Sequence, residues 1–586
     1  LLKVVLREHK LGSYKLDNVS AHFIRGKLID NIYEPTTDTT KLITDNTDAL
    51  SVEGYITIMI NRGTFEEKLN KGQKWQIISL TKDCIEVRGD IELYLKKYKY
   101  NWCQAKDDVS PKDIFRLQKG TSSDRAIVAK YCIKDCVLCL DLMNKLSIIP
   151  NNIGMANVCS VPLSYIFQRG QGIKVFSLIS KECYNLHYVI PELYKSTAVG
   201  SYEGAIVLKP KPGIYLDEPI AVLDYSSLYP SSMISHNLSH DSIVLDSQWE
   251  GEEGKSKLED MGYKVEDVYY DIYDWQIIGN RKNATKVNTG KQKCCRYVQP
   301  KREEDGSIKS ENRAIIPRIL ESLLAQRKKT RRRIKYKTIL TKTGDKLVGL
   351  VEDKGSNWKV KLDNDRVVNV SKDNVVKIQK TYNDFQNQVW DGLQLAYKIT
   401  ANSMYGSIGA KTSNISFIDI AASTTSVGRT MLETAADFAL KEYPDAEITY
   451  GDTDSIFVNF HTKDSKGNPL KGREALKKVI ECGERVEKLI APTLPKPQYL
   501  EYEKTFWPFI LFTKKRYVGN KYEFDINKFK QTCMGIVLKR RDNAPIVKLI
   551  YGGIIDILMA TGDIDESINF LQRSMMKLIN GKFSME

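Results

Sequence analysis

Hydrophobic positions recur with a helical period in three long stretches of the chain. Between residues 119 and 146, apolar side chains three and four positions apart form one face. Pro317, a residue type that helices accept in their first turn, opens a second stretch of this kind. A third stretch runs from about residue 385 to residue 405. We therefore expect a long helix in each of these places.

Other stretches alternate between apolar and polar residues, which is the period of a half-buried strand. Residues 31–108 do so in short runs and predict an inserted module of strands and turns. Residues 347–378 repeat the pattern and predict a small insert resembling a β-barrel. Residues 448–460 predict a hairpin whose turn lies at Gly451-Asp452. A buried strand is expected at Ile220–Leu223.

Length and composition narrow the class of protein. The usual domain size of ~100–200 residues predicts three to five domains for a chain of 586 residues. Hydrophobic residues make up 42% and charged residues 27%, which excludes a chain that is disordered throughout. The net charge of +15 fits a polyanionic partner. No apolar run reaches the ~18 residues that cross a bilayer, so we expect no membrane partner.

Eleven cysteines are scattered along the chain, and reduced thiols are the expected state. Cys132, Cys136 and Cys139 stand at helical spacing in an apolar stretch. A zinc site would need a fourth ligand, and no second pair with metal-like spacing follows. We therefore expect these three residues to be small buried positions on a helix.

Carboxylates at strand ends are the most informative feature. Asp224 ends one predicted strand, and Asp452 and Asp454 flank Thr453 in the predicted hairpin. A single Asp at such a place is more often a turn former. If the two strands lie side by side in one sheet, however, Asp224 comes next to Asp454, and a cation must neutralise them. Mg²⁺ takes one or two carboxylates plus substrate phosphates, and two such ions form a phosphoryl-transfer site.

A polar stripe on the third predicted helix offers groups for a nucleotide. Gln394, Lys398, Asn402 and Tyr405 follow each other at steps of four, four and three residues. Lys398 supplies a charge for a phosphate, Asn402 an amide, and Tyr405 a flat face for a base or sugar. A solvated helix face is the alternative interpretation. Arg327, on the helix before, would be a second phosphate ligand, whereas the basic residues beside it look like exposed charge.

Two basic segments complete the candidate chemistry. They are Lys514-Lys515-Arg516-Tyr517 and Lys539-Arg540-Arg541. Clusters of this kind neutralise backbone phosphates without reading sequence, although short basic runs are also common by chance.

Four segments carry a resemblance to a known family, and they occur in that family's order. They are Asp224-Tyr225-Ser226-Ser227-Leu228-Tyr229-Pro230-Ser231, Lys398-Ile399-Thr400-Ala401-Asn402-Ser403-Met404-Tyr405-Gly406, Tyr450-Gly451-Asp452-Thr453-Asp454-Ser455 and Lys514-Lys515-Arg516-Tyr517. They resemble the polymerase motifs of family B DNA polymerases. The resemblance runs along most of the chain and is greatest to eukaryotic polymerase delta and to the polymerases of nucleocytoplasmic large DNA viruses.

The resemblance implies a catalytic role for three carboxylates and nucleotide contacts for seven residues. Asp224 and Asp454 would hold two Mg²⁺ ions, with Asp452 in a secondary role. The residues expected to bind the incoming dNTP are Ser227, Leu228, Tyr229, Arg327, Lys398, Asn402 and Tyr405. Among them, Tyr229 would lie under the deoxyribose and exclude a 2′-hydroxyl group.

The resemblance also implies contacts with primer–template DNA and a remnant of an exonuclease. The expected DNA contacts are Tyr202, Gly204, Lys514, Lys515, Arg516, Tyr517 and Arg540. Tyr131 and Asp135 match the third motif of the family's 3′–5′ exonuclease, with Asp135 as a metal ligand. The two earlier exonuclease motifs are not found in order, so proofreading is expected of a longer parent protein and not of this chain.

The implied fold is α/β and multidomain, of the right-hand polymerase type. It combines a palm of antiparallel sheet plus helices, helical fingers, a partial thumb and a truncated RNase H-like exonuclease domain. The chain is expected to be a fragment that lacks an N-terminal part and most of the thumb. The expected domains are an exonuclease remnant at 1–150 with an insert at 31–108, palm at 151–312, fingers at 313–410 with a β-rich insert at 340–380, palm again at 411–535, and the start of the thumb at 536–586.

The implied activity is template-directed DNA synthesis from a primer 3′-hydroxyl by a two-metal mechanism. Primer–template DNA and dNTPs are the implied partners, with a sliding clamp as a further one through a C-terminal segment. The implied location is intracellular, either the nucleus or a cytoplasmic viral factory. Two alternatives stay open: an RNA-making or reverse-transcribing enzyme, against which Tyr229 argues, and a catalytically silent scaffold that binds DNA, against which Asp224 and Asp454 argue.

Overall fold

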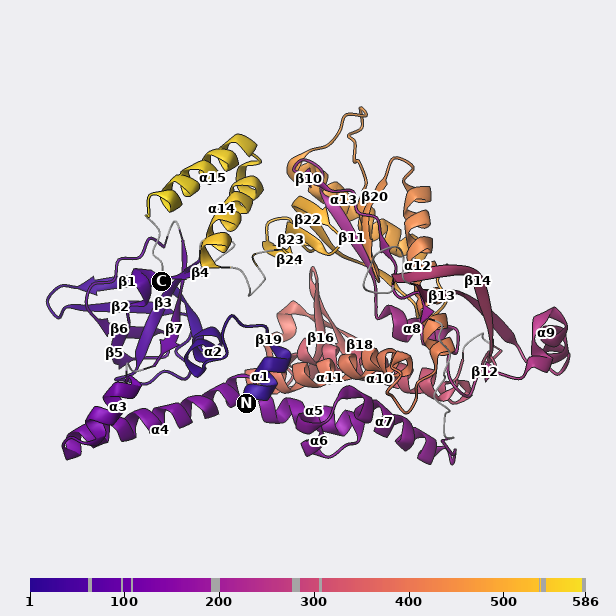
Figure 1. Ribbon diagram of the computed structural model, residues 1–586, viewed down its shortest axis with the longest axis horizontal. Coiled ribbons are helices and arrows are strands. Elements are labelled where there is room, and N and C mark those ends of the chain that lie inside the picture. The colour runs from indigo at the N-terminus through magenta and orange to yellow at the C-terminus, as the bar shows by residue number, and fades with distance from the viewer. Residues whose placement is uncertain are drawn as a thin grey trace. The chain divides into compact units, whose positions relative to one another are not determined.

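The computed structural model describes residues 1–61, 66–95, 98–106, 109–190, 201–276, 285–304, 308–536, 538 and 544–581. The chain forms two compact units (Figure 1). Unit 1 comprises Leu1–Ile149, Gly213–Leu216 and Trp507–Glu586. Unit 2 comprises Pro150–Pro212 and Asp217–Phe506. The architecture is therefore mixed α/β, with antiparallel sheets and helices in both units.

The N-terminal part of unit 1 contains the predicted strand-rich insert. Its antiparallel sheet closes on itself, because β7 pairs with both β1 and β3. The ring is filled by large apolar side chains, among them Trp75, Trp102 and Leu42. The strands are β1 Arg25–Glu34, β2 Thr39–Thr44, β3 Tyr55–Asn61, β4 Glu66–Lys68, β5 Trp75–Leu80, β6 Cys84–Arg88 and β7 Lys99–Ala105, with a 3₁₀ turn η1 at Leu69–Gly72.

Short helices precede the ring and a long helix follows it. The predicted helix at 119–146 is present as α4, Ser122–Lys145, and Thr121 caps it because its side chain accepts from the Asp124 amide. Leu138 and Leu142 of α4 join the core of the ring. The other helices are α1 Leu2–Glu8, α2 Leu16–Phe23 and α3 Pro111–Gln118.

The C-terminal part of unit 1 is a small sheet with two helices. A buried cluster that includes Ile510, Val518 and Ile555 joins the sheet to the first helix. The elements are β10 Gly213–Tyr215, the part of β22 (Leu500–Thr513) that follows Phe506, β23 Arg516–Tyr522, β24 Phe529–Met534, α14 Pro545–Thr561 and α15 Ile564–Ile579.

Unit 2 is built on a second antiparallel sheet. From β22, whose first half lies in this unit, the strand order continues through β11, β21 and β20 to β9. Buried residues from two of its helices, such as Leu432 and Val486, pack on this sheet. The elements are β9 Val207–Leu208, β11 Ile220–Tyr225, β20 Glu447–Asp452, β21 Ser455–Asn459, α8 Leu228–Ser235, α12 Ile418–Glu442 and α13 Gly472–Ile490.

A long hairpin extends from this region, and its strands β13 and β14 run beside each other (Figure 1). Its base is fixed by Arg296, which donates two hydrogen bonds of 2.7 Å to Asp267. The elements are β8 Ser201–Tyr202, β12 Ile243–Val244, β13 Val265–Gln276, β14 Thr285–Val298, α9 Gly251–Asp260 and the 3₁₀ turns η2 Ser247–Trp249 and η3 Ser310–Asn312.

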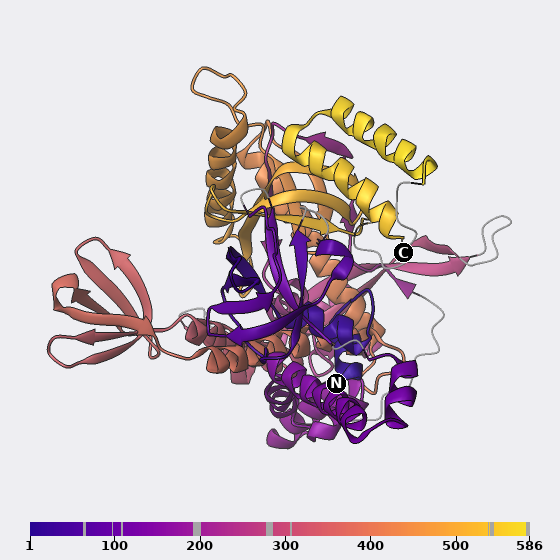
Figure 2. The ribbon, with the colours of Figure 1, turned by 90° about the vertical axis from the view of Figure 1, so that its left-hand side faces the viewer.

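Two long helices carry the second predicted insert. They are α10, Ile315–Ile334, and α11, Asp384–Gly409, which pack on each other. Between them lies the module, residues Lys337–Lys380, a five-stranded sheet with the order β18-β17-β16-β15-β19. Figure 2 shows the module projecting from the ends of the two helices. The remaining elements are β15 Lys337–Thr341, β16 Lys346–Lys354, β17 Asn357–Leu362, β18 Val367–Ser371, η4 Lys372–Asn374, β19 Val375–Lys380, α5 Ile148–Cys159, α6 Leu163–Gln168 and α7 Gln171–Asn185.

Two sequence predictions need correction. The hairpin turn is formed by Thr453 and Asp454, and Gly451 lies within β20. Cys132 and Cys136 are on a helix as predicted but are exposed, because the buried side of α4 is formed by other residues.

Within the described ranges, no helix combines the length and the apolar character that a membrane span requires.

Candidate functional site

Asp224 stands at the end of a strand that is paired on both sides. In β11 it lies opposite Ser455 of β21 on one side and opposite Glu501 of β22 on the other. The four residues before it, Ile220 to Leu223, are buried, so the strand is anchored in the core. Asp224 therefore cannot move away from its neighbours without breaking strand pairing.

The hairpin brings Asp454 to the same place. Thr453 adopts a left-handed backbone with φ 62°, which makes a tight turn of two residues between β20 and β21. The Tyr225 amide then donates to the Asp454 carbonyl at 2.7 Å, and the Thr453 amide donates to Ile206 O at 3.1 Å. Asp224 and Asp454 are thus adjacent, as the sequence predicted, and Asp452 precedes the turn opposite Ser455.

The two carboxyl groups are held in an environment that opposes their ionisation. Burial, followed by the charges of Asp454 and Glu503, raises the pKa of Asp224 to about 8. Burial also raises the pKa of Asp454, and the charges of Asp452 and Glu503 act in the same direction, while Lys398 opposes them. The site therefore has an excess of negative charge that a cation would relieve.

The donor set fits a hard divalent cation that is shared with a substrate. Asp224 supplies carboxylate oxygens from the end of β11, and Asp454 supplies them from the turn that leads into the adjacent strand β21. Within the described ranges, no group of three or more His, Cys, Asp or Glu side chains is arranged to hold a metal by itself. Mg²⁺ bound by one or two carboxylates completes its shell with water and phosphate oxygens, so a site of two carboxylates is sufficient.

The segment after Asp224 turns sharply into helix α8. Ser227 has φ 56° and ψ 54°, a left-handed conformation that ends β11 and begins the helix. Tyr229, in the first turn of α8, lies with its ring 4.6 Å from the ring of Tyr405 on α11. Gly428 of α12 makes room for it, since a Cβ there would lie 3.0 Å from Tyr229 Cε1. Burial raises the pKa of Tyr229 to about 12, so its hydroxyl is neutral.

A basic cavity of about 600 Å³ lies beside this turn. Arg327 Nη1 donates to Ser227 Oγ at 3.4 Å, and Arg327 Nε is buried without a hydrogen-bond partner among the described residues. Burial, with Arg331 close by, lowers the pKa of Arg327. An anion in the cavity would supply the missing acceptor. The lining residues include Ser226, Ser227, Arg327, Lys328, Arg331, Arg332, Lys335, Leu350, Tyr499 and Glu501.

Of the three stripe residues of α11 that were predicted to bind a nucleotide, two are exposed. Lys398 and Asn402 are exposed, and the charge of Lys398 acts on Asp454. Tyr405 is half-buried, and its hydroxyl lies 3.5 Å from that of Tyr202. Gly409 accommodates this contact, because a Cβ there would meet the Tyr202 hydroxyl at 2.8 Å.

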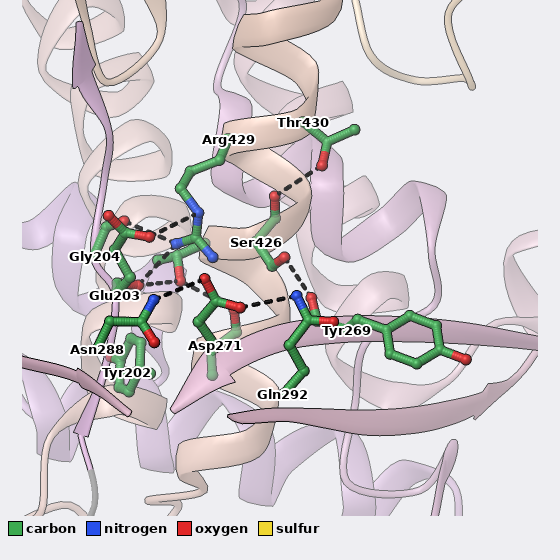
Figure 3. Close-up of polar contacts among 12 residues, drawn as sticks. Tyr202, Glu203, Gly204, Tyr269, Asp271, Asn288, Gln292, Ser426, Arg429 and Thr430 are labelled. Atoms are coloured by element: carbon green, nitrogen blue, oxygen red, sulfur yellow. Dashed lines mark hydrogen bonds and ion pairs between the residues drawn. The ribbon is translucent and has the colours of Figure 1, made fainter. Parts of the chain in front are cut away.

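An arginine that sequence reasoning missed holds the segment Tyr202-Glu203-Gly204. Arg429 of α12 donates to the carbonyls of Glu203 and Gly204 at 3.0 and 3.1 Å (Figure 3). Thr425 of the same helix adds a hydrogen bond of 2.8 Å to the Glu203 carbonyl. The segment therefore lies fixed against α12, close to Tyr405.

Comparison with known proteins shows the family of the chain. The sequence model of DNA polymerase family B matches residues 161–345 and 368–586. The chain belongs to DNA polymerase family B. It is 48% identical over 589 residues to a DNA polymerase of Pyramimonas orientalis virus, covering 100% of this chain and 45% of that protein. It is 30% identical over 494 residues to the DNA polymerase delta catalytic subunit of Drosophila melanogaster, covering 83% of this chain and 37% of that protein.

The chain thus spans less than half the length of these family B relatives. The predicted family and its likeness to viral and delta-type polymerases are confirmed. A DNA polymerase of Phaeocystis pouchetii virus is also similar, at 36% identity over 525 residues, covering 84% of this chain and 45% of that protein.

The basic motif of the family B chain lies in unit 1. Lys514 and Lys515 form the turn between β22 and β23, and Lys515 has φ 60°. Gly535 is required beside this turn, because a Cβ there would meet Lys515 O at 2.1 Å. Arg516 is exposed, and Tyr517 lies 5.6 Å from the ring of Phe509. The predicted contact Arg540 lies outside the described residues.

The predicted exonuclease pair lies on α4 with a lysine between its groups. Lys106 Nζ lies 2.7 Å from Asp135 Oδ1 and donates to the Tyr131 hydroxyl at 3.3 Å. Both residues border a cavity of about 420 Å³ in unit 1. A lysine ammonium thus neutralises the carboxylate that the resemblance assigns to a metal.

Three residues near the site gave no signal in the sequence that we could interpret. Arg429 and Gly428 come from a helix whose relation to residues 202–204 depends on tertiary packing. Glu503 lies on β22, two positions beyond the partner of Asp224, and only the strand order identifies it as a neighbour of the site.

Proposed function

We propose that the chain is the core of a replicative DNA polymerase that extends a primer 3′-hydroxyl with dNTPs on a DNA template. In this proposal the sheet β22-β11-β21-β20-β9 belongs to the palm, and α10 and α11 with their module are the fingers. Helices α14 and α15 begin the thumb, and residues 1–150 include the exonuclease remnant. The observation that carries the proposal is the pair Asp224 and Asp454, held side by side by the pairing of β11 with β21 in a place where burial and neighbouring carboxylates raise the pKa of both groups.

Each residue near this pair has a part in the proposed reaction. When bound, two Mg²⁺ ions would neutralise the carboxylates and the phosphates and lower the barrier to phosphoryl transfer. Asp224 and Asp454 would hold them, with Asp452 in a secondary role. Arg327, Lys398 and Asn402 would orient the triphosphate, together with the backbone at Ser227 and Leu228. The primer 3′-oxygen would attack the α-phosphate and pyrophosphate would leave.

Sugar and template selection would depend on the aromatic cluster. Tyr229 is packed against Gly428 and Tyr405, so its ring has little freedom to move aside for a 2′-hydroxyl. Tyr202 and Gly204 would contact the template strand, and Arg429 holds their segment through the carbonyls of Glu203 and Gly204. Lys514, Lys515, Arg516, Tyr517 and Arg540 would contact the primer–template backbone. The longer protein would add proofreading and a sliding-clamp partner.

Primer extension with Mg²⁺ tests the proposal. The Asp454→Asn variant should lose extension by a factor of about 10³ or more, because a site of two carboxylates cannot spare one. Asp437→Asn, a substitution at an exposed position of α12, is the matched control and should extend like the unchanged chain. Equal product from Asp454→Asn and the control would contradict the metal assignment. Incorporation of ribonucleotides by Tyr229→Ala but not by the unchanged chain would exclude an RNA-making enzyme.

A further inference from the structure

The module Lys337–Lys380 separates its charges in an unusual way. It contains ten Lys and Arg residues against six Asp and Glu residues, a net charge of +4. Its acidic turn at 363–365 faces α10, where Arg333 contacts Asp363 at 3.1 Å and Arg332 contacts Asp365 at 3.0 Å. The acidic groups of this turn therefore attach the module to the helix. Glu352 and Asp353 pair with Lys354 and Lys372 within the module.

Three other lysines of the module gather at the opposite part of the sheet. Leu340 of β15 lies directly across from Lys346 of β16 on one side and from Lys377 of β19 on the other. Residues that lie directly opposite in antiparallel strands point to the same face, so Lys346 and Lys377 flank Leu340 on one surface. Lys342 follows in the β15–β16 turn. All three lysines are exposed, and within the described part of the chain none has an ion-pair partner.

This surface leads to the basic cavity. Side chains of a strand alternate between faces, so Lys346, Val348 and Leu350 of β16 share one face. Leu350 lines the cavity that also contains Ser227 and Arg327. Lys346 is four residues away along the strand, a distance of about 14 Å. The family match is interrupted at residues 346–367, which include Lys346, whereas Lys342 and Lys377 lie within the matched segments.

We propose that the face formed by Lys342, Lys346 and Lys377 binds the phosphodiester backbone of duplex DNA beside the nucleotide cavity. The proposal extends the proposed polymerase function and rests on it for the identity of the nucleic acid. Duplex is favoured over single-stranded DNA because single-strand sites use exposed aromatic rings as stacking platforms. The aromatic ring of the module, Trp358, is instead covered by Lys372, whose Nζ lies 4.7 Å from the ring centre. Contacts of this type are independent of base sequence.

Salt dependence of binding tests the proposal. Fluorescence anisotropy of the full chain with a labelled DNA duplex gives log K against log salt concentration, with no need for catalysis. Each phosphate contact adds about 0.9 to the slope, so K342Q/K346Q/K377Q should lower its magnitude by about 2 to 3. The matched control is K441Q/K477Q/K488Q, which removes the same charge from exposed lysines of α12 and α13. It should leave the slope unchanged to within about 0.5.

The possible outcomes separate this inference from the polymerase assignment. An equal fall in slope for both triple variants, or no fall for either, overturns the inference. Loss of affinity confined to a single-stranded oligonucleotide overturns the choice of duplex. A thermal melt identical to that of the unchanged chain establishes that the variant is folded. If the unchanged chain binds duplex DNA but does not extend a primer, the polymerase proposal fails while the binding result remains valid.

Discussion

Asp224→Asn should stabilise the protein while abolishing its proposed activity. The pKa of Asp224 is raised to about 8 from its ordinary value of 3.8 by burial and by Asp454. In the absence of a cation, the folded state therefore holds a protonated carboxyl group at neutral pH. The unfolded chain releases that proton above pH ~4 and is favoured accordingly. An asparagine at position 224 does not titrate in this pH range, so the substitution removes this free-energy cost of folding.

The magnitude follows from the two pKa values. The cost is absent below pH ~4, where both states are protonated, rises with pH, and levels off above the folded-state pKa of about 8. At 1.36 kcal/mol per pKa unit it is about 2 kcal/mol at pH 5 and about 5 kcal/mol at pH 7.5. Unit 2 has roughly 350 residues, for which 1 kcal/mol corresponds to about 1–2 °C. Asp224→Asn should therefore raise the melting temperature by about 5–10 °C at pH 7.5.

Differential scanning calorimetry in EDTA, from pH 5 to pH 9, measures this difference. The gain should fall to about 2–4 °C at pH 5, because the wild-type cost declines there. Adding Mg²⁺ should raise the melting temperature of the unchanged chain but not of Asp224→Asn, since a cation that binds only the folded state stabilises it. Asp260→Asn, at an exposed position at the end of α9, is the control and should show neither effect.

Two results would refute this reasoning. The first is a melting temperature for Asp224→Asn that equals or falls below that of the unchanged chain in EDTA at pH 7.5. The second is an equal Mg²⁺ response in the two proteins. Either result would mean that Asp224 is not held in the charged cluster that the fold builds around it.

Two further predictions concern the residues that support the site. Arg429→Met removes the donor to the Gly204 carbonyl and one of the two donors to the Glu203 carbonyl, so the free energy of unfolding should fall by about 1–3 kcal/mol and affinity for primer–template should fall. Thr425→Val, which removes one hydrogen bond, should have a smaller effect in the same melting and anisotropy measurements. Gly451→Ala places a Cβ 2.6 Å from Leu208 Cδ1, so chemical denaturation should show that the free energy of unfolding falls by about 1–3 kcal/mol. If the clash is the cause, Leu208→Ala in the same chain should partly restore it.

Local periodicity was enough to predict the two elements that carry the carboxylates. Asp224 ends an apolar strand, and Asp454 lies in the hairpin between two others. The pairing of β11 with β21, which brings the two carboxylates together, joins segments far apart in the chain and is not determined by their local patterns. The turn itself was misplaced by two residues. Gly451 suggested a turn. In the structure its lack of a side chain instead allows Leu208 of β9 to lie close to it, and that contact depends on tertiary structure.

Charge was the least predictable property. The arginines after Arg327 looked like exposed charge, but Arg332 and Arg333 are partly buried and form ion pairs with a turn about 30 residues away. Exposed cysteines on α4 were expected to be buried for a similar reason: helical spacing identifies a shared face but not what that face meets. Long-range partners, which decide both cases, have no local signal.

Strand pairing explains why the site is both rigid and electrostatically unfavourable. Two like charges that are free to move will separate, and their repulsion then disappears. Binding of a cation would therefore stabilise them little. Asp224 is paired on one side with Ser455 and on the other with Glu501, and its neighbour Tyr225 is fixed through its hydroxyl to Met431 O at 2.9 Å. The repulsion therefore cannot be relieved by movement of the strand. It can be relieved by a proton or by a cation, and a cation that also carries phosphate oxygens relieves it while it positions the proposed substrate.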